Sequence, residues 1–445
     1  MPAASSAPVA AVSHPRFGEA LRFWLKLGFI SFGGPTGQIA IMHTELVEKR
    51  RWIGEERFLH ALNYCMLLPG PEAQQLVIYC GWLLHRTWGG LLAGILFVLP
   101  SAFILWGLSY VYVTYGGLPW ISAVFHGLKP AVLAIVAAAV LRIGSKALKN
   151  AVMWSLAALA FVAIFLFHAP FPAIILTAAL TGYLGGLRWE KVFNVVKGHG
   201  AKSAGGRGAV IDDSHAAPAH TKPSLPRAFR VLATGLVLWW LPVLLAALAQ
   251  GRSGTLVRES LFFSKAALVT FGGAYAVLPY VAQQAVENFH WLTAPQMLDG
   301  LGLAETTPGP LIMVLQFVGF LGGWNHPGAL SPLLAATLGA AVTTWVTFVP
   351  CFIWIFLGAP YLEQLRHQTR LTCALSAVTA AVVGVVLNLA AWFGLHVILP
   401  AGGGVDWFVA GVAVAAFVAL QRFKAGIISV VLAGAGLGLL RYLAL

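Results

Sequence analysis

Long apolar runs recur along almost the whole of this 445-residue chain, and they constrain its fold more than any other feature. One of them, LLAGILFVLPSAFILWGLSYVYV at residues 91–113, contains no charged residue. A helix needs about 20 such residues to cross a hydrocarbon core about 30 Å thick. Only 10% of the residues are charged, against about 25% in a soluble domain. The sequence therefore predicts an all-α polytopic membrane protein, and not an outer-membrane barrel of short alternating segments.

The remaining composition argues against several other classes. The net charge of +13 is typical of a membrane protein with Lys and Arg in its cytoplasmic loops, and no nucleic-acid motif accompanies it. The four cysteines lie in or beside apolar segments without metal-ligand spacing. No Walker A, nucleophile-elbow or dinucleotide-binding motif occurs. We expect no nucleic acid, no metal and no cofactor, and a protein that is not an enzyme.

Composition divides the chain into five parts. Residues 1–16 lack a basic start and an apolar core, so they predict a disordered tail and no signal peptide. Residues 188–229 are rich in Gly, Ala, Ser, Pro and basic side chains, which is typical of a flexible linker, here expected in the cytoplasm. The predicted membrane parts are a first repeat at 17–187, a connecting helix at 230–250 and a second repeat at 251–445.

The two membrane parts repeat one another. Phe32-Gly33-Gly34 matches Phe271-Gly272-Gly273 at an offset of 239 residues (271 − 32), and the same offset carries Pro69-Gly70-Pro71 onto Pro308-Gly309-Pro310. The match runs without a gap from Phe23 to Pro71 and indicates a duplication.

The FGG and PGP motifs interrupt the first two apolar segments of each half. Each resulting piece is about 15 residues, or about 22 Å, too short to span the hydrocarbon core. The pieces form either two halves of a broken crossing or the arms of a re-entrant hairpin. The loop HTELVEKRRWIGEER at 43–57 is basic, whereas its equivalent at 283–296 has no Lys or Arg. This asymmetry favours hairpins and an inverted topology of the two halves.

Interrupted helices in an inverted repeat are typical of secondary transporters, which bind substrate near the midplane. Pro35, Pro71 and Pro310 are interpreted as first-turn prolines of new helices. The free N–H groups of such a first turn favour an anion. A role of these glycines and prolines in close helix packing is the alternative, but four breaks in matching positions favour function.

These breaks supply the candidate anion-binding residues. Lys26 and Lys265 lie six residues before each FGG and are added to the site, with snorkelling to the interface as the alternative. Glu72 and Glu305 are candidates for a coupling proton, or alternatively local caps. His60 with its counterpart Asp299, and Arg142 with its counterpart Asn388, are interpreted as structural or interfacial. The full candidate set is Lys26, Phe32, Gly33, Gly34, Pro69, Gly70, Pro71, Lys265, Phe271, Gly272, Gly273, Pro308, Gly309 and Pro310.

The stretches KLGFISFGGPTGQIA with LLPGPEAQQL, and KAALVTFGGAYAVLP with AETTPGP, resemble the chromate ion transporter (CHR) family in its long, two-repeat form. The resemblance covers both halves from about residue 17 onward, without the linker. It implies export of chromate through the bacterial inner membrane, chromate resistance, and sulfate as a competitor. The oligomeric state is left open, with a homodimer as one expectation.

Two matters remain open at this point. A carrier of sulfate or another oxyanion is the nearest alternative, and a channel or a membrane enzyme fits less well. Moving a dianion outward through 100 mV releases about 4.6 kcal/mol, so the membrane potential is the expected driving force. Exchange against a proton is the alternative or an addition.

Overall fold

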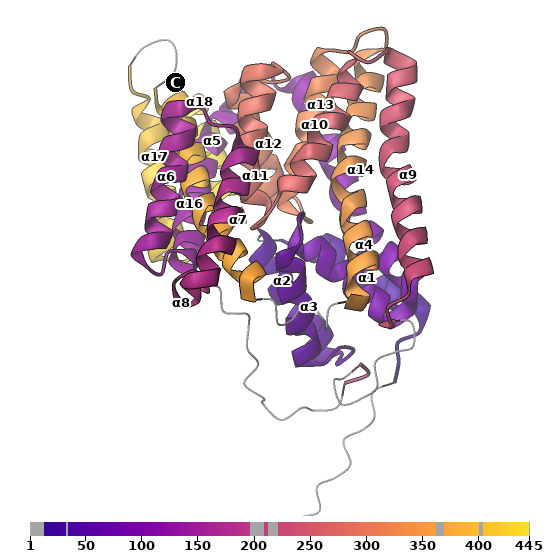
Figure 1. Ribbon diagram of the computed structural model, residues 1–445. Coiled ribbons are helices and arrows are strands. Elements are labelled where there is room, and N and C mark those ends of the chain that lie inside the picture. The colour runs from indigo at the N-terminus through magenta and orange to yellow at the C-terminus, as the bar shows by residue number, and fades with distance from the viewer. Residues whose placement is uncertain are drawn as a thin grey trace, which may run out of the picture.

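The computed structural model describes residues 13–32, 34–195, 209–211, 221–361, 369–399 and 404–444. Within them the chain is helical, apart from loops and a single parallel β-bridge between Ile53 and Ile211. Figure 1 shows two groups of helices with the shorter α2, α3, α11 and α12 between them. The predicted all-helical class is confirmed.

In the described residues the first half has eight helices and one π turn. They are α1 (Phe17–Ile30), α2 (Gly34–His43), a π turn (Thr44–Lys49), α3 (Glu55–Leu67), α4 (Glu72–Tyr115), α5 (Pro119–Ala147), α6 (Ala151–Phe167), α7 (Phe171–Arg188) and the short α8 (Glu190–Phe193). Helix α4 is kinked at His85 and Arg86, where the backbone leaves the helical conformation.

The connecting helix α9 (Leu225–Gln250) leads into the second half. The elements of the second half in the described residues are α10 (Thr255–Val269), α11 (Ala274–Gln283), a π turn (Gln284–Asn288), α12 (Ala294–Thr306), a 3₁₀ turn (Leu311–Met313), α13 (Val314–Asn325), α14 (Pro332–Gly358), a 3₁₀ turn (Ala359–Tyr361), α16 (Thr369–Ile398), α17 (Trp407–Arg422) and α18 (Ile427–Ala444).

The repeat extends to fine details of the backbone. Shifting α3 by 239 residues gives the bounds of α12. Each half has a π turn after its second helix. Two residues past each turn the chain takes a left-handed conformation, at Arg51 and at His290. Such single αL residues are uncommon outside glycine, so their recurrence at equivalent positions supports one ancestral backbone for both halves.

Seven helices in the described residues are long and apolar enough to cross a membrane. Many large apolar side chains face outward, among them Phe103 and Leu248, which are 68% and 75% exposed. A soluble protein would bury such residues, whereas lipid is an apolar solvent for them. The outer surface of the helix groups is therefore suited to the bilayer.

The two halves interlock through α5 and α16. Helix α5 of the first half packs on α17 and α18, and α16 of the second half packs on α6 and α7. Glycines allow close approach: a Cβ added at Gly127 would lie 2.1 Å from the carbonyl oxygen of Gly434. Small residues at helix crossings are a general feature of membrane interfaces.

Some predicted boundaries shift in the structure. The connecting helix begins at Leu225 and not at residue 230, because Pro226 occupies its first turn, where proline is favoured. The segment assigned to the linker also contains α8 and the bridging residue Ile211, whereas 196–208 and 212–220 lie outside the described residues. The same holds for residues 1–12 of the expected N-terminal tail.

Candidate functional site

All four predicted breaks coincide with helix ends. The chain leaves α1 at Ser31, α3 at Leu68, α10 at Thr270 and α12 at Thr307. Glycines with positive φ provide the turns at the breaks, since other residues are strained there. They are Gly34, Gly70, Gly272, Gly273 and Gly309, with φ from 67° to 121°. Gly33 of the candidate set lies outside the described residues.

The breaks hydrogen-bond to one another across the two halves. The backbone N–H of Gly309 donates to the carbonyl oxygen of Ser31 at 2.8 Å, and that of Gly70 donates to the carbonyl oxygen of Thr270 at 2.7 Å. Both partners of one bond map onto the partners of the other at the offset of 239. Each PGP break is thus joined to the FGG break of the opposite half. We call these places the Ser31 junction and the Thr270 junction.

The prolines lie where new helices start. Pro35 is the second residue of α2, in its first turn as predicted. Pro71 and Pro310 were predicted in the first turn of a helix, but each is the residue directly before it: Pro71 precedes α4, and Pro310 precedes the turn Leu311–Met313. In that position proline sets an extended entry to the helix, and the first-turn N–H groups that follow have no partner within their own helix.

The Ser31 junction is lined by neutral polar side chains. Gln38 of α2 donates its amide to the carbonyl oxygen of Gly309. Ser101 of α4 lies against Gly309, since a Cβ added there would be 2.7 Å from the Ser101 Cβ. Ser31, Gln38 and Ser101 are fully buried. The Ser31 and Ser101 hydroxyls and the Gln38 Oε1 have no hydrogen-bond partner in the part of the chain that the structure describes.

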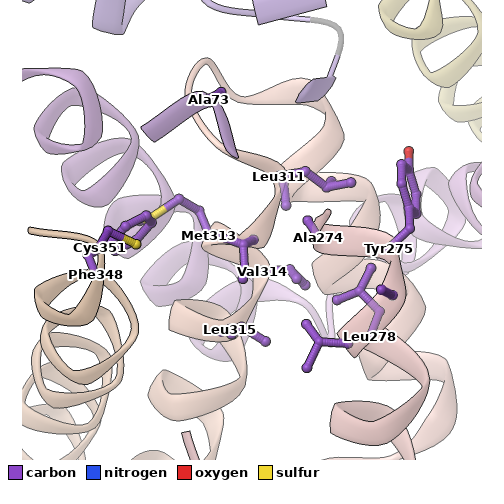
Figure 2. Packing of buried hydrophobic residues seen from close by; sticks show 14 of the residues in the cluster. Ala73, Ala274, Tyr275, Leu278, Leu311, Met313, Val314, Leu315, Phe348 and Cys351 are labelled. Atoms are coloured by element: carbon purple, nitrogen blue, oxygen red, sulfur yellow. The ribbon is translucent and has the colours of Figure 1, made fainter. Parts of the chain in front are cut away.

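The Thr270 junction has the same backbone but a satisfied hydroxyl, while the Gln75 Oε1 has no hydrogen-bond partner among the described residues. The Thr270 hydroxyl donates to the Ala266 carbonyl oxygen at 2.6 Å, and the Gln75 amide donates to the Pro69 carbonyl oxygen at 2.8 Å. Cys351 of α14 takes the place of Ser101, with its Sγ 3.0 Å from a Cβ added at Gly70. Figure 2 shows Cys351 and Phe348 packed with Met313, beside the start of α11 at Ala274 and Tyr275.

Glu72 lies beside the Thr270 junction, and Glu305 connects the two junctions, since its helix α12 ends at the Ser31 junction while its side chain meets Tyr275. Glu72 is the first residue of α4, and its Oε1 is 4.0 Å from a Cβ added at Gly273. Glu305, near the end of α12, accepts a hydrogen bond from the hydroxyl of Tyr275 in the first turn of α11. The Arg142 guanidinium lies over the Tyr275 ring, 5.8 Å from its centre. The structure thus brings together two carboxyls that are not equivalent in the repeat.

The two lysines differ from the other candidates because their side chains are exposed. Neither Lys26 nor Lys265 forms an ion pair with any described residue. Lys26 lies near Glu45, which belongs to the first π turn. The pKa of the Glu45 carboxyl is lowered mainly by the hydrogen bond from Lys49, with a smaller effect from the charge of Lys26. The lysines therefore lie with exposed side chains on α1 and α10, the helices that end at the two junctions.

Sequence reasoning missed Ser31, Gln38, Ser101 and Tyr275, and interpreted Arg142 as structural. Ser31 and Gln38 stand beside the FGG motif, so a count of polar residues next to the breaks would have found them. Ser101 follows the helix proline Pro100 and is remote in sequence from every break. Only the tertiary contact with Gly309 reveals it.

Comparison with known proteins places these motifs in a family. The Chromate transporter family model matches residues 18–183 and again residues 258–439. The two matched segments correspond to the two halves on either side of the linker and α9. This confirms the duplication expected from the offset of 239 residues.

Relatives cover most of the chain. The chromate transport protein of Pseudomonas aeruginosa is 32% identical over 82% of this chain and 77% of its own length. That of Cupriavidus metallidurans is 28% identical over 95% and 93%, and the probable chromate transport protein of Synechococcus elongatus is 30% identical over 84% of each. No solved structure matches the chain significantly. With the family model on both halves, this chain belongs to the chromate transporter family, a family of multi-pass membrane transporters and not of enzymes.

Proposed function

We propose that this protein exports chromate from the bacterial cytoplasm through the inner membrane as a secondary transporter and confers chromate resistance. The substrate is taken from the relatives that are named chromate transport proteins. The protein's own residues argue for the class of ligand, a small oxyanion, because the buried breaks offer N–H and hydroxyl donors. Sulfate, a tetrahedral dianion of similar size, is the second candidate.

One observation carries the proposal: each PGP break is hydrogen-bonded to the FGG break of the other half. Backbone freed inside a membrane must face protein or a cavity, and here it gathers at two places deep in the protein. Helices α2, α4 and α11 begin at the breaks, so that positive dipole ends converge there. In transporters with broken helices, such ends point at anionic groups of the substrate.

We assign the anion to the Ser31 junction and the coupling proton to the Thr270 junction. A dianion about 5 Å from an ionised Glu72 or Glu305 would be repelled by about 7 kcal/mol at an effective dielectric constant of about 20. This exceeds the roughly 4.6 kcal/mol gained by moving a dianion through 100 mV. The Ser31 junction is the farther of the two from Glu72 along α4 and offers the Ser31 and Ser101 hydroxyls as donors, whereas Glu305, four residues before Gly309, must be protonated for the anion to bind. Protonation of the carboxyls would relieve the repulsion as the anion passes.

The two halves have inverted topology in this proposal, and the broken segments are re-entrant hairpins. Three observations support it. Helices α5 and α16 pack reciprocally on the opposite halves. The 43–57 loop is basic, whereas the equivalent segment 283–296 contains Glu287 and no Lys or Arg. In Figure 1, α2 and α3 lie toward one end of the molecule and α11 and α12 toward the other.

Cysteine labelling tests the topology. Glu48 and Glu287 are equivalent, exposed residues in the two π turns, and the four native cysteines are buried. A membrane-impermeant maleimide added to intact cells should label Glu287→Cys and not Glu48→Cys. Equal labelling of the two variants from outside would contradict the inverted arrangement.

Transport in everted vesicles tests the function. Export then appears as uptake of radioactive chromate, which should be saturable, inhibited by sulfate and reduced when valinomycin with potassium collapses the potential. Unchanged uptake after the potential is collapsed would favour electroneutral exchange. No uptake of chromate, with clear uptake of sulfate, would assign the protein to the second candidate.

A further inference from the structure

An apolar groove opens on the outside of the helix bundle, and its inner wall reaches Phe348 beside the Thr270 junction. It is lined by α4, α9 and α14, with Gln316 of α13, and has a volume of about 1090 Å³. Figure 1 shows α9 beside α14 along one edge of the molecule. The groove extends along α4 from Leu91 to Trp106, about 22 Å at the rise of an α-helix. This exceeds the half-thickness of the hydrocarbon core, about 15 Å.

The wall of the groove leaves little for a polar ligand to bind. Its lining is mainly Leu, Val, Ile, Phe and Trp side chains. The Gln316 amide is already used, since it donates to the Ala102 carbonyl oxygen at 2.7 Å and accepts from Thr344. The Trp106 indole donates to the Thr337 hydroxyl at 3.1 Å. An oxyanion would lose its hydration here without replacement, so this groove is not an anion path.

Positive charge is confined to one end of the groove. Arg227 and Arg230 lie in the first turns of α9 and both line the groove. The Arg230 side chain is exposed. The Arg227 guanidinium donates a hydrogen bond to the backbone oxygen of Lys222, so that Lys222 is a third basic residue near this end of the groove. An apolar trough with arginines at one mouth matches an amphiphile that has an anionic head and a hydrocarbon tail. Arginine is suited to phosphate because its planar fork donates two hydrogen bonds at once.

We propose that this groove binds an anionic phospholipid. The phosphate lies between Arg227 and Arg230, and one acyl chain runs along α4 and α14 toward Trp106 and Trp345. Because α9 joins the two halves, the lipid bridges the connecting helix to the core of both halves. Basic residues near a membrane surface each contribute about fivefold to the affinity for anionic lipid, so the preference over a zwitterionic lipid is predicted to be large.

Native mass spectrometry of the purified full-length protein tests this inference. The protein is taken from liposomes of equimolar palmitoyl-oleoyl phosphatidylglycerol and phosphatidylcholine. The wild type should retain one phosphatidylglycerol in preference to phosphatidylcholine. In Arg227→Gln/Arg230→Gln the ratio of the two lipids should fall by about fivefold for each arginine removed. Arg188→Gln, an exposed arginine at the end of α7, is the matched control and should keep the wild-type ratio.

A second variant tests the hydrocarbon part of the site. Ala341 lines the groove with its side chain exposed, so Ala341→Trp should fill it and abolish retention of both lipids. The inference is overturned if the arginine variant keeps the wild-type ratio, or if a folded Ala341→Trp protein still retains the lipid. A dimer mass without lipid in the wild type would overturn it in favour of a second copy of the chain. If Ala341→Trp does not fold, the arginine variant decides alone.

Discussion

The Ser31 and Thr270 junctions share a backbone and differ in almost every side chain. Both have an N–H···O bond between a PGP glycine and the last residue before an FGG motif, at 2.8 and 2.7 Å. Around this common frame the first junction has Ser31, Gln38 and Ser101, and the second has Thr270, Val277 and Cys351. The duplication has therefore preserved the frame while the chemistry of the two sites has diverged.

The divergence has a direct physical meaning at the hydroxyl positions. Threonine in a helix readily bonds to the carbonyl four residues earlier, and Thr270 does so with Ala266. The equivalent Ser31 hydroxyl has no such partner among the described residues. A buried hydroxyl without a partner costs about 1–3 kcal/mol, a cost that a bound oxyanion would remove. The Ser31 junction thus has free hydroxyl donors for an anion, whereas the Thr270 junction has a hydroxyl that is already bonded and the Glu72 carboxyl beside it.

The largest effect should follow from altering the shared frame. Gly309→Ala places a Cβ 2.7 Å from that of Ser101, and Gly70→Ala places one 3.0 Å from the sulfur of Cys351, both at positive φ. Strain of this kind costs on the order of 1–3 kcal/mol, so each variant should lose most chromate transport. Gly107→Ala on α4 is the control, because nothing lies within 4 Å of its added Cβ. If only one of the two alanine variants loses chromate transport, the backbone geometry of the two junctions does not contribute equally to transport.

The next effect should distinguish the two sites by their donors. Ser31→Ala and Ser101→Ala each remove a hydroxyl that we assign to the anion, and a hydrogen bond to a charged group contributes about 1.5 kcal/mol or more. Each variant should therefore raise the KM for chromate about tenfold. The matched variants Thr270→Val and Cys351→Ala should leave KM within about twofold. Equal effects at both junctions would contradict the assignment of the anion to the Ser31 side.

The repeat was readable from the sequence, and so were the helix breaks. Glycine and proline act through local backbone geometry, so their positions predicted the helix ends at Ser31, Leu68, Thr270 and Thr307. The pairing of each PGP with the opposite FGG was not predictable, because that contact joins residues far apart in the chain.

The lysines are a different case. Their equivalence and their apolar setting predict a direct role, which stays a prediction, because periodicity does not fix which face of a helix meets the core. In the structure Lys26 and Lys265 lie on exposed faces of α1 and α10. Ser101 is the opposite case, because the sequence did not predict a role for it. A serine in a long apolar helix indicates nothing about a site until its contact with Gly309 is known.

A smaller effect is expected on coupling. Glu72→Gln and Glu305→Gln keep the shape of each side chain but remove its proton chemistry. Chromate uptake into everted vesicles should continue under a membrane potential, and its stimulation by a pH gradient should be lost. Tyr275→Phe removes the hydrogen bond to Glu305 and should shift the pH dependence without abolishing it. If both glutamine variants still respond to the pH gradient, the Thr270 junction does not carry the proton.

The smallest effect should come from the lysines, and it sharpens the comparison because the two are equivalent. An exposed charge acts on a dianion mainly through water, so Lys26→Ala or Lys265→Ala should reduce kcat/KM for chromate only about fivefold, which is about 1 kcal/mol. The loss should shrink at high salt, since the Debye length falls to about 3 Å at 1 M. Lys→Arg at either position should restore the wild-type rate, because this attraction needs the charge of the side chain and not its shape.

Under the inverted topology the lysines face opposite sides of the membrane. Lys26→Ala should then slow uptake from the cytoplasmic face of everted vesicles, and Lys265→Ala should slow uptake into right-side-out vesicles. Complete loss of transport in either variant, independent of salt, would instead make that lysine a direct ligand of the anion.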